Sequence, residues 1–182
     1  MSSKENIEFS DLPQECLMAK SEIFDSVDPR GVFNITCRSS DGSILWEEEC
    51  KNLVVNAGRN DILNQYFRGL SYSASFFVGL KTAGSINALD TMPSKSWTEI
   101  TLYSNATRPA YTTVASTARS ITNSASPAVF NINGSATVGG CFITTNNVPG
   151  GTTGTLFSAV DFASARIVAS SDTLTVTYTV SC

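Results

Sequence analysis

Strict alternation of apolar and polar side chains near the C-terminus is the feature that most constrains how this chain can fold. In residues 172–180 four large apolar side chains alternate with threonines. Residues 127–134 repeat the pattern, with Ala128, Phe130 and Ile132 at every second position. Because successive side chains of a strand point to opposite sides of a sheet, this period of two predicts strands with one buried and one solvated face.

Strand-like segments separated by turn residues continue through most of residues 31–182. Residues 31–38 and 43–49 flank an Asp-Gly pair at Asp41 and Gly42, which supplies the positive φ that a tight hairpin requires. Further strands are predicted at residues 74–80, 97–103, 109–116, 127–134, 136–145, 154–162 and 172–180. Residues 146–154 are rich in Gly and no helix pattern follows them, so we expect an exposed turn there and no phosphate cradle. About eight short strands with such turns are typical of an all-β fold, and we expect a β-sandwich of the jelly-roll type.

One short helix is predicted near residues 57–68. Asn56 can cap its N-terminus, and Gly69 can close its C-terminus. Its apolar face is made by Ile62, Leu63, Tyr66 and Phe67. This stripe is more typical of a helix that packs on a sheet than of a ligand site. We expect Ile62, Leu63 and Tyr66 to seat the helix.

Residues 1–30 are expected to form an extended N-terminal arm, and residues 31–182 to form the sandwich domain. The arm combines acidic residues and two prolines with large apolar side chains that follow no helix or strand period. It is too apolar for a simple linker, so we expect it to lie against its own domain or a neighbouring subunit. Residues 1–61 carry a net charge of −6 and residues 62–182 a net charge of +2. This split favours an acidic segment that docks on a neighbour, with a solvated acidic arm as the alternative.

Overall charge and hydropathy argue against two classes of partner. The net charge is −4 and no basic patch is evident, so nucleic-acid binding is not expected. No stretch approaches the roughly 18 apolar residues of a membrane span, and acids occupy the place of a signal-peptide core. A protein made and retained in the cytoplasm is expected. The five cysteines contain no CxxC pair, which predicts buried thiols and neither a disulfide framework nor a zinc site.

Catalytic chemistry has few possible carriers in this sequence. The chain has no histidine, which removes histidine-based triads, dyads and metal ligands. Four isolated acids of the domain are expected to cap turns or aid solubility: Asp90, Glu99, Asp161 and Asp172. Three consecutive acids, residues 47–49, should splay onto opposite faces of a solvated edge strand. We therefore predict no catalytic, cofactor-binding or metal-binding residues and no enzymatic activity.

Aromatic side chains and a glycine pair have structural interpretations. A sandwich core needs large side chains, so we expect the core to take six aromatics that could otherwise line a sugar site: Phe76, Phe77, Trp97, Tyr103, Tyr111 and Phe142. Trp97 and Phe77 are predicted to be decisive core residues. Gly139 and Gly140 fall within a strand pattern, which indicates a β-bulge or a close backbone approach.

Several of these segments also resemble a known family. Residues 52–80, 90–112, 139–146, 150–159 and 172–182 contain a helix signature, a VGL strand and a TRPA segment in a characteristic order. Over residues 50–182 the chain resembles small virion structural proteins of tailed bacteriophages, in which a short helix introduces a β-sandwich. It departs from the pattern at Ala57 and Arg59, where an acid and an apolar residue are expected. The first 50 residues have no counterpart.

The resemblance implies a role in the virion, reached by assembly in the host cytoplasm. Such proteins are regarded as capsid decoration (cement) or head-fibre proteins, so the major capsid protein is the expected partner. A homo-oligomer, such as a trimer, is also expected, because the edge strands of a small sandwich need cover. An alternative is a neck, tail or fibre component that binds a receptor or glycan. A third class, a glycan hydrolase, would depend on Asp161 or Glu99, and its activity would be lost in the alanine variants.

Overall fold

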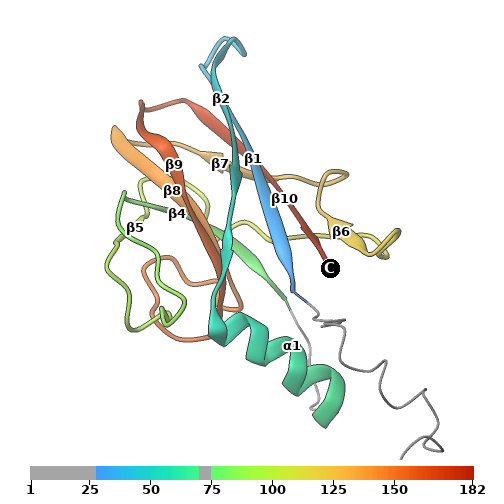
Figure 1. Ribbon diagram of the computed structural model, residues 1–182. Helices are drawn as coiled ribbons and strands as arrows, with labels where there is room; N and C mark the ends of the chain where they lie inside the picture. The colour runs from blue at the N-terminus through green and yellow to red at the C-terminus, as the bar shows by residue number, and fades with distance from the viewer. Residues whose placement is uncertain (1–27, 70–74) are drawn as a thin grey trace, which may run out of the picture.

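Two antiparallel sheets face each other in this protein, whose computed structural model describes residues 28–69 and 75–182 (Figure 1). One sheet has the order β2-β1-β10-β6, with β7 also beside β10. Its strands are β1 (Arg30–Arg38), β2 (Ile44–Lys51), β6 (Ser120–Thr122), β7 (Ala128–Asn131) and β10 (Thr173–Ser181). The other sheet has the order β3-β9-β8-β4-β5. Its strands are β3 (Leu53–Val54), β4 (Phe77–Lys81), β5 (Glu99–Ile100), β8 (Ala136–Thr144) and β9 (Leu156–Val168).

The predicted all-β sandwich with one short helix is confirmed for the described residues. The start and end of the domain pair with each other: β1 lies along β10, and β3 lies along β9. This nested pairing is the feature shared with a jelly roll. Two hairpins within single sheets, β1–β2 and β8–β9, depart from a regular jelly roll. The predicted arm falls outside the described residues except for residues 28–30.

The alternating patterns form the core as predicted. Leu174, Val176 and Tyr178 of β10 are buried, while the threonines between them are half-buried. In β7, Phe130 is buried and Val129 is exposed. Each large apolar side chain that is fully removed from water stabilises the fold by roughly 1.5–3 kcal/mol, so these inward faces hold the two sheets together.

Two predictions about local backbone geometry are also confirmed. The β1–β2 hairpin turns at Gly42, whose φ is 87°. The Asp41 carboxylate accepts hydrogen bonds from Ser39 and from the Ser43 backbone N–H, and these bonds lower its pKa to about 2. In β8 the register shifts between Val138 and Gly140, and a Cβ on Gly139 would lie 1.9 Å from the Ala83 backbone nitrogen. Bulge and close approach therefore occur together.

One predicted strand is wrong. Residues 109–116 form no strand and contact the second sheet through an isolated bridge between Ala110 and Phe77. Pro109 has no N–H to donate to a ladder, and its carbonyl accepts from Val78. The strand predicted over residues 97–103 shortens to the two residues of β5, whereas β9 continues six residues beyond its predicted end, to Val168.

The predicted helix exists, but its predicted packing face is wrong. Helix α1 spans Asn56–Arg68 and ends at Gly69 in the left-handed conformation, as expected. Asn56 is the first helical residue and not the cap, since the N-cap position is Val55. Ile62 packs partly against the core, but Leu63 and Tyr66 are 51% and 81% exposed. The buried residue of α1 is Gly58, where a Cβ would lie 2.4 Å from the Phe157 carbonyl oxygen.

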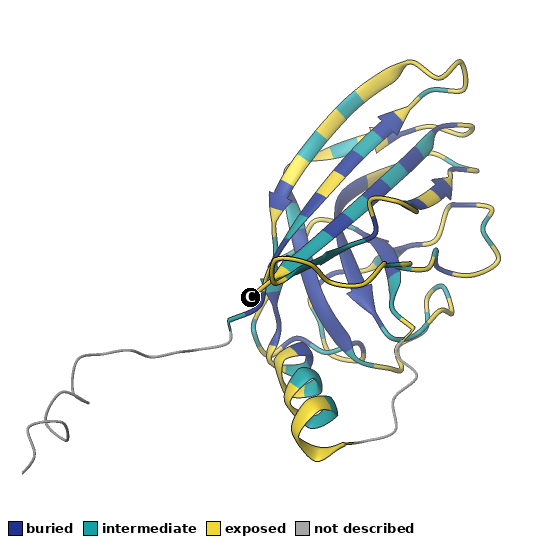
Figure 2. Cartoon of the chain, turned by 90° about the vertical axis from the view of Figure 1, so that its right-hand side faces the viewer, coloured by how far each residue is buried: buried dark blue, intermediate teal, exposed yellow. Residues whose placement is uncertain are grey.

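The helix therefore rests on β9 through its first turns, and its second half extends beyond the sheets. Figure 1 shows α1 at the end of the sandwich opposite the β1–β2 turn. In Figure 2 the end of α1 furthest from the sheets is mostly exposed. The apolar side chains at this end of the helix, which we expected to pack on the sheet, instead form an exposed apolar surface.

Candidate functional site: an apolar groove beside helix α1

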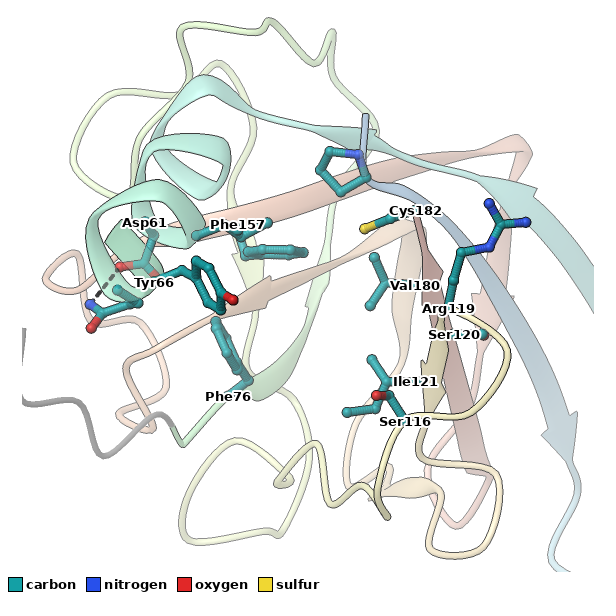
Figure 3. Close-up of a pocket in the computed structure, with 13 residues that line it drawn as sticks. Asp61, Tyr66, Phe76, Ser116, Arg119, Ser120, Ile121, Phe157, Val180 and Cys182 are labelled. Atoms are coloured by element: carbon teal, nitrogen blue, oxygen red, sulfur yellow. Dashed lines mark hydrogen bonds between the residues drawn. The ribbon is translucent and has the colours of Figure 1, made fainter. Parts of the chain in front are cut away.

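A groove of about 1040 Å³ lies between α1, β6 and the end of β10. We call it the α1 groove and define it by its main apolar lining residues: Ile62, Tyr66, Phe76, Ile121, Phe157 and Val180. Figure 3 shows Tyr66, Phe76 and Phe157 on one side of the open space and Ile121 and Val180 on the other. The groove is open to solvent and most of its lining is apolar, which suits non-covalent binding of apolar groups.

The α1 groove continues into the interior of the sandwich. A second cavity of about 280 Å³ shares four lining residues with it: Phe76, Ile121, Phe157 and Val180. Tyr111 and Tyr178 line only the inner cavity, and their rings lie 5.5 Å apart. Phe76 and Phe157 pack edge to face at 5.5 Å between the two spaces. This end of the core is therefore less completely filled than the centre.

Polar groups stand around the groove and not at its centre. Arg119 is exposed on the turn before β6, where Ala118 and Arg119 have φ values of 49° and 60°. Such left-handed conformations are unfavourable for non-glycine residues. The Arg119 carbonyl accepts a hydrogen bond from the Cys182 N–H at 3.1 Å, which holds the turn against the end of β10.

The chain enters the described structure at the edge of the same groove. Pro29 is part of the lining, and β1 begins one residue later, with Arg30 paired to Ser181. Asp28 forms an ion pair with Arg59 of α1, with 3.0 Å between Oδ1 and Nη2. Residues 28 and 29 therefore lie next to both the helix and the end of β10.

Exposed apolar side chains of α1 extend this surface. Tyr66 and Phe67 are 81% and 75% exposed, and their rings contact edge to face at 5.1 Å. Leu63 lies on the exposed side of the same helix. Adjacent residues of a helix point about 100° apart, so Tyr66 and Phe67 cannot both point directly at the core. This spacing is the sequence signal that could have predicted some exposed aromatic surface.

The predictions for the four isolated acids divide evenly. Asp90 and Asp172 cap turns as expected, since each carboxylate accepts a hydrogen bond from a backbone N–H three residues earlier. Glu99 and Asp161 do not fit the prediction. Glu99 pairs with Arg108, and Asp161 pairs with the buried Lys81.

Glu99 and Arg108 form the most enclosed ion pair in the described part of the chain. Nε and Nη2 of Arg108 donate to the two oxygens of the Glu99 carboxylate, at 2.8 and 2.6 Å. Arg108 also donates to the carbonyls of Asn146 and Gly151, at 2.6 and 2.9 Å. Glu99 accepts a bond from the Gly150 N–H at 2.7 Å. The cluster thus fastens the exposed 146–154 turn to β5, a structural role that accounts for both charged groups.

The three consecutive acids splay onto opposite faces as predicted, but not all of them are solvated. Glu47 and Glu49 are exposed. Glu48 points the other way, where Arg166 Nη2 lies 2.9 Å from its carboxylate and the Ala163 N–H also donates to it. The hydrogen bond from Arg166 lowers the pKa of Glu48. This pair links β2 to β9 across the two sheets.

The six aromatics are confirmed as parts of the packed interior, with one correction. Trp97, Tyr103 and Phe142 are buried, whereas Phe76 and Tyr111 are half-buried against the core. Phe77 is also half-buried, but it is not a core residue. Phe77 alternates with Val78 and Leu80 in β4, so its side chain lies on the opposite face from those buried residues.

Free thiols occupy two different environments. Cys37, Cys50 and Cys141 are buried, as predicted, and Cys182 is exposed in the α1 groove. Burial raises the pKa of Cys37 and Cys50 to about 11 and raises that of Cys141 as well. Cys16 lies outside the described residues.

We expect one fast-reacting thiol in a Cys16→Ser variant treated with Ellman's reagent at pH 8. Cys182 is accessible, while the three buried thiols are protonated at that pH and should react only on unfolding. Absorbance at 412 nm counts the thiols that react before and after denaturant is added. A Cys16→Ser/Cys182→Ser variant is the control and should show no fast phase. Two or more fast thiols in the first variant would contradict the packing described for β1, β2 or β8.

Among residues 28–69 and 75–182, no three His, Cys, Asp or Glu side chains gather closely enough to hold a metal ion. No helix in these ranges is both long and apolar enough to span a bilayer.

Comparisons with protein-family models, curated proteins and solved structures find no match to this chain. The resemblance of residues 50–182 to bacteriophage virion proteins therefore stays a prediction.

Proposed function

We propose that this protein is a non-enzymatic structural component of a tailed-phage virion, a capsid decoration (cement) protein that binds the outer surface of the head. The observation that carries the proposal is the exposed apolar surface made by the α1 groove with Leu63, Tyr66 and Phe67. Apolar surface of this extent on a small domain is typical of protein interaction sites. The resemblance to phage proteins suggests a location in the virion, and the exposed apolar surface suggests how the protein binds there.

The segments that carry the resemblance have structural roles that support a shared fold. The VGL segment places Val78 and Leu80 in the core. The TRPA segment contains Arg108, which pairs with Glu99 and anchors the turn between β8 and β9. The helix signature packs through Gly58 on β9. These roles fit a β-sandwich that is preceded by a short helix. Because these residues stabilise the fold, docking would involve other, exposed residues.

The distribution of charge supports a docking role for the arm. Residues 1–27 hold 6 of the 16 acidic and 2 of the 12 basic side chains, which leaves 10 of each in residues 28–182. The domain is thus neutral, and the surplus of negative charge belongs to the segment before it. In the proposal, this acidic segment contacts neighbouring subunits of the major capsid protein, while the domains associate as a homo-oligomer such as a trimer.

Copy number in the purified virion tests the proposal. We expect copies on the scale of the major capsid protein, because a decoration protein repeats over the whole shell. Quantitative mass spectrometry with labelled peptides of both proteins gives the ratio, and particles washed at high salt serve as the control for loosely adsorbed protein. A few copies per particle would contradict decoration and favour the neck, tail or fibre alternative, and absence from the particle would exclude both.

A further inference from the structure

We propose that residues 20–27, the segment immediately before the described structure, fold back into the α1 groove of their own chain. The apolar occupants are Ile23, Phe24 and Val27. This inference concerns the purified protein and does not rest on a role in the virion. With residues 20–27 in the groove, Leu63 and Phe67 stay exposed and residues 1–19 stay available for the contacts with the capsid protein proposed above.

The first argument is the place where the chain enters. Pro29 already lines the groove, and Asp28 is held against α1 by Arg59. A chain extends by at most about 3.6 Å per residue, so Phe24 can reach no further than about 18 Å from Pro29. The three apolar residues of the segment, Ile23, Phe24 and Val27, are therefore tethered close to the groove. Such a short tether gives a millimolar-range effective concentration, which favours the chain's own segment over a second copy.

The second argument is chemical complementarity. The groove presents aliphatic and aromatic side chains, and its inner extension adds further apolar volume. The segment KSEIFDSV offers an adjacent apolar pair, Ile23 and Phe24, and a third apolar group at Val27. Arg119 stands at the rim with no ion pair among the described residues, within reach of Glu22 or Asp25.

The third argument weighs a small molecule as the occupant. Small-molecule sites generally enclose their ligand and fix it with a few convergent polar groups. The α1 groove is open along its length, and its polar groups lie at the rim. An extended peptide that carries several apolar side chains fits an open, apolar groove better.

Hydrogen exchange on the full-length protein tests the inference. We expect the amides of residues 20–27 to exchange at least about tenfold more slowly than in an unstructured peptide of the same sequence. A Tyr66→Ser variant removes an aromatic group of the lining and should reduce this protection. A Phe67→Ser variant is the matched control, because Phe67 is similarly exposed but is not part of the lining, and it should leave the protection unchanged. Exchange of residues 20–27 at unprotected rates, or an equal loss in both variants, would overturn the proposal.

Cysteine crosslinking decides whether the segment belongs to the same chain. A Cys16→Ser/Phe24→Cys variant places a thiol in the segment, opposite the exposed Cys182 of the groove. Mild oxidation with diamide should give a monomer in which a disulfide joins the introduced thiol to Cys182, identified by peptide mass spectrometry. A Cys16→Ser/Ser3→Cys variant, with its thiol 21 residues earlier in the sequence than position 24, should crosslink more slowly. A predominantly dimeric product would assign the segment to a second copy and overturn the own-chain assignment, and no crosslink would overturn occupancy itself.

Discussion

An Arg108→Met variant is expected to lose about 3–5 kcal/mol of unfolding free energy, because it leaves Glu99 buried without its cation. The Arg108 side chain is completely buried and that of Glu99 is 6% exposed, so water cannot replace the lost partner. The carbonyls of Asn146 and Gly151 lose their donor in the same step. Urea denaturation at pH 7, followed by circular dichroism, measures the change.

Two further variants make this result interpretable. Arg30 pairs with Asp28 at the surface with its side chain 83% exposed, and Arg30→Met should change stability by less than about 0.5 kcal/mol. A Glu99→Leu/Arg108→Met variant removes both charges and should recover part of the loss. If Arg108→Met cost no more than Arg30→Met, the ion pair would not be the anchor of the 146–154 turn.

A Trp97→Ala variant is expected to lower the free energy of unfolding by about 3–5 kcal/mol, the usual range for a large buried aromatic. Trp97 is 4% exposed and packs on Phe142 with ring centroids 4.9 Å apart. The ammonium groups of Lys81 and Lys95 lie 5.4 and 5.0 Å from its ring, so the variant also removes two cation–π contacts. The same urea titration measures the effect.

Phe67→Ala is the matched control for this change, since Phe67 is an aromatic residue that is 75% exposed. Its effect should be within about 0.5 kcal/mol. A loss of under about 1 kcal/mol for Trp97→Ala would mean that the packing of Trp97 against Phe142 and its buried neighbours contributes little to stability. Arg108 also lies over the Phe142 ring, at 5.4 Å, so the Arg108 and Trp97 effects should not be additive.

The parts of the fold that could be predicted from sequence are those with a local signal. Alternation in β7 and β10 shows which side chains point inward, and an Asp-Gly pair marks the β1–β2 turn. The strand wrongly predicted at residues 109–116 also rests on a local signal, because Thr and Val have a high strand propensity whether or not a neighbouring strand is available. Strand formation also needs an adjacent edge, and here the chain meets the sheet at a single bridge.

The α1 groove and the buried ion pair could not be predicted in the same way. The groove is made by segments from both ends of the domain, so its existence depends on how far α1 extends beyond β9. Glu99 and Arg108 are nine residues apart, but their remaining partners, Gly150 and Gly151, come from a distant turn. An isolated acid beside polar residues resembles a solvated one until tertiary structure closes over it.

The pairing of β1 with β10 has a consequence for synthesis on the ribosome. All nine residues of β1 are paired with β10, and β3 is paired with β9. In each sheet, therefore, a strand that is synthesised early can complete its pairing only after a strand near the C-terminus has been synthesised. The β1–β2 hairpin can form early, but the other edge of β1 stays unpaired until residues 173–181 have emerged. Nascent chains of this protein should therefore become protease-resistant only around release, and messages cut short before β10 should yield polypeptides that quality control removes.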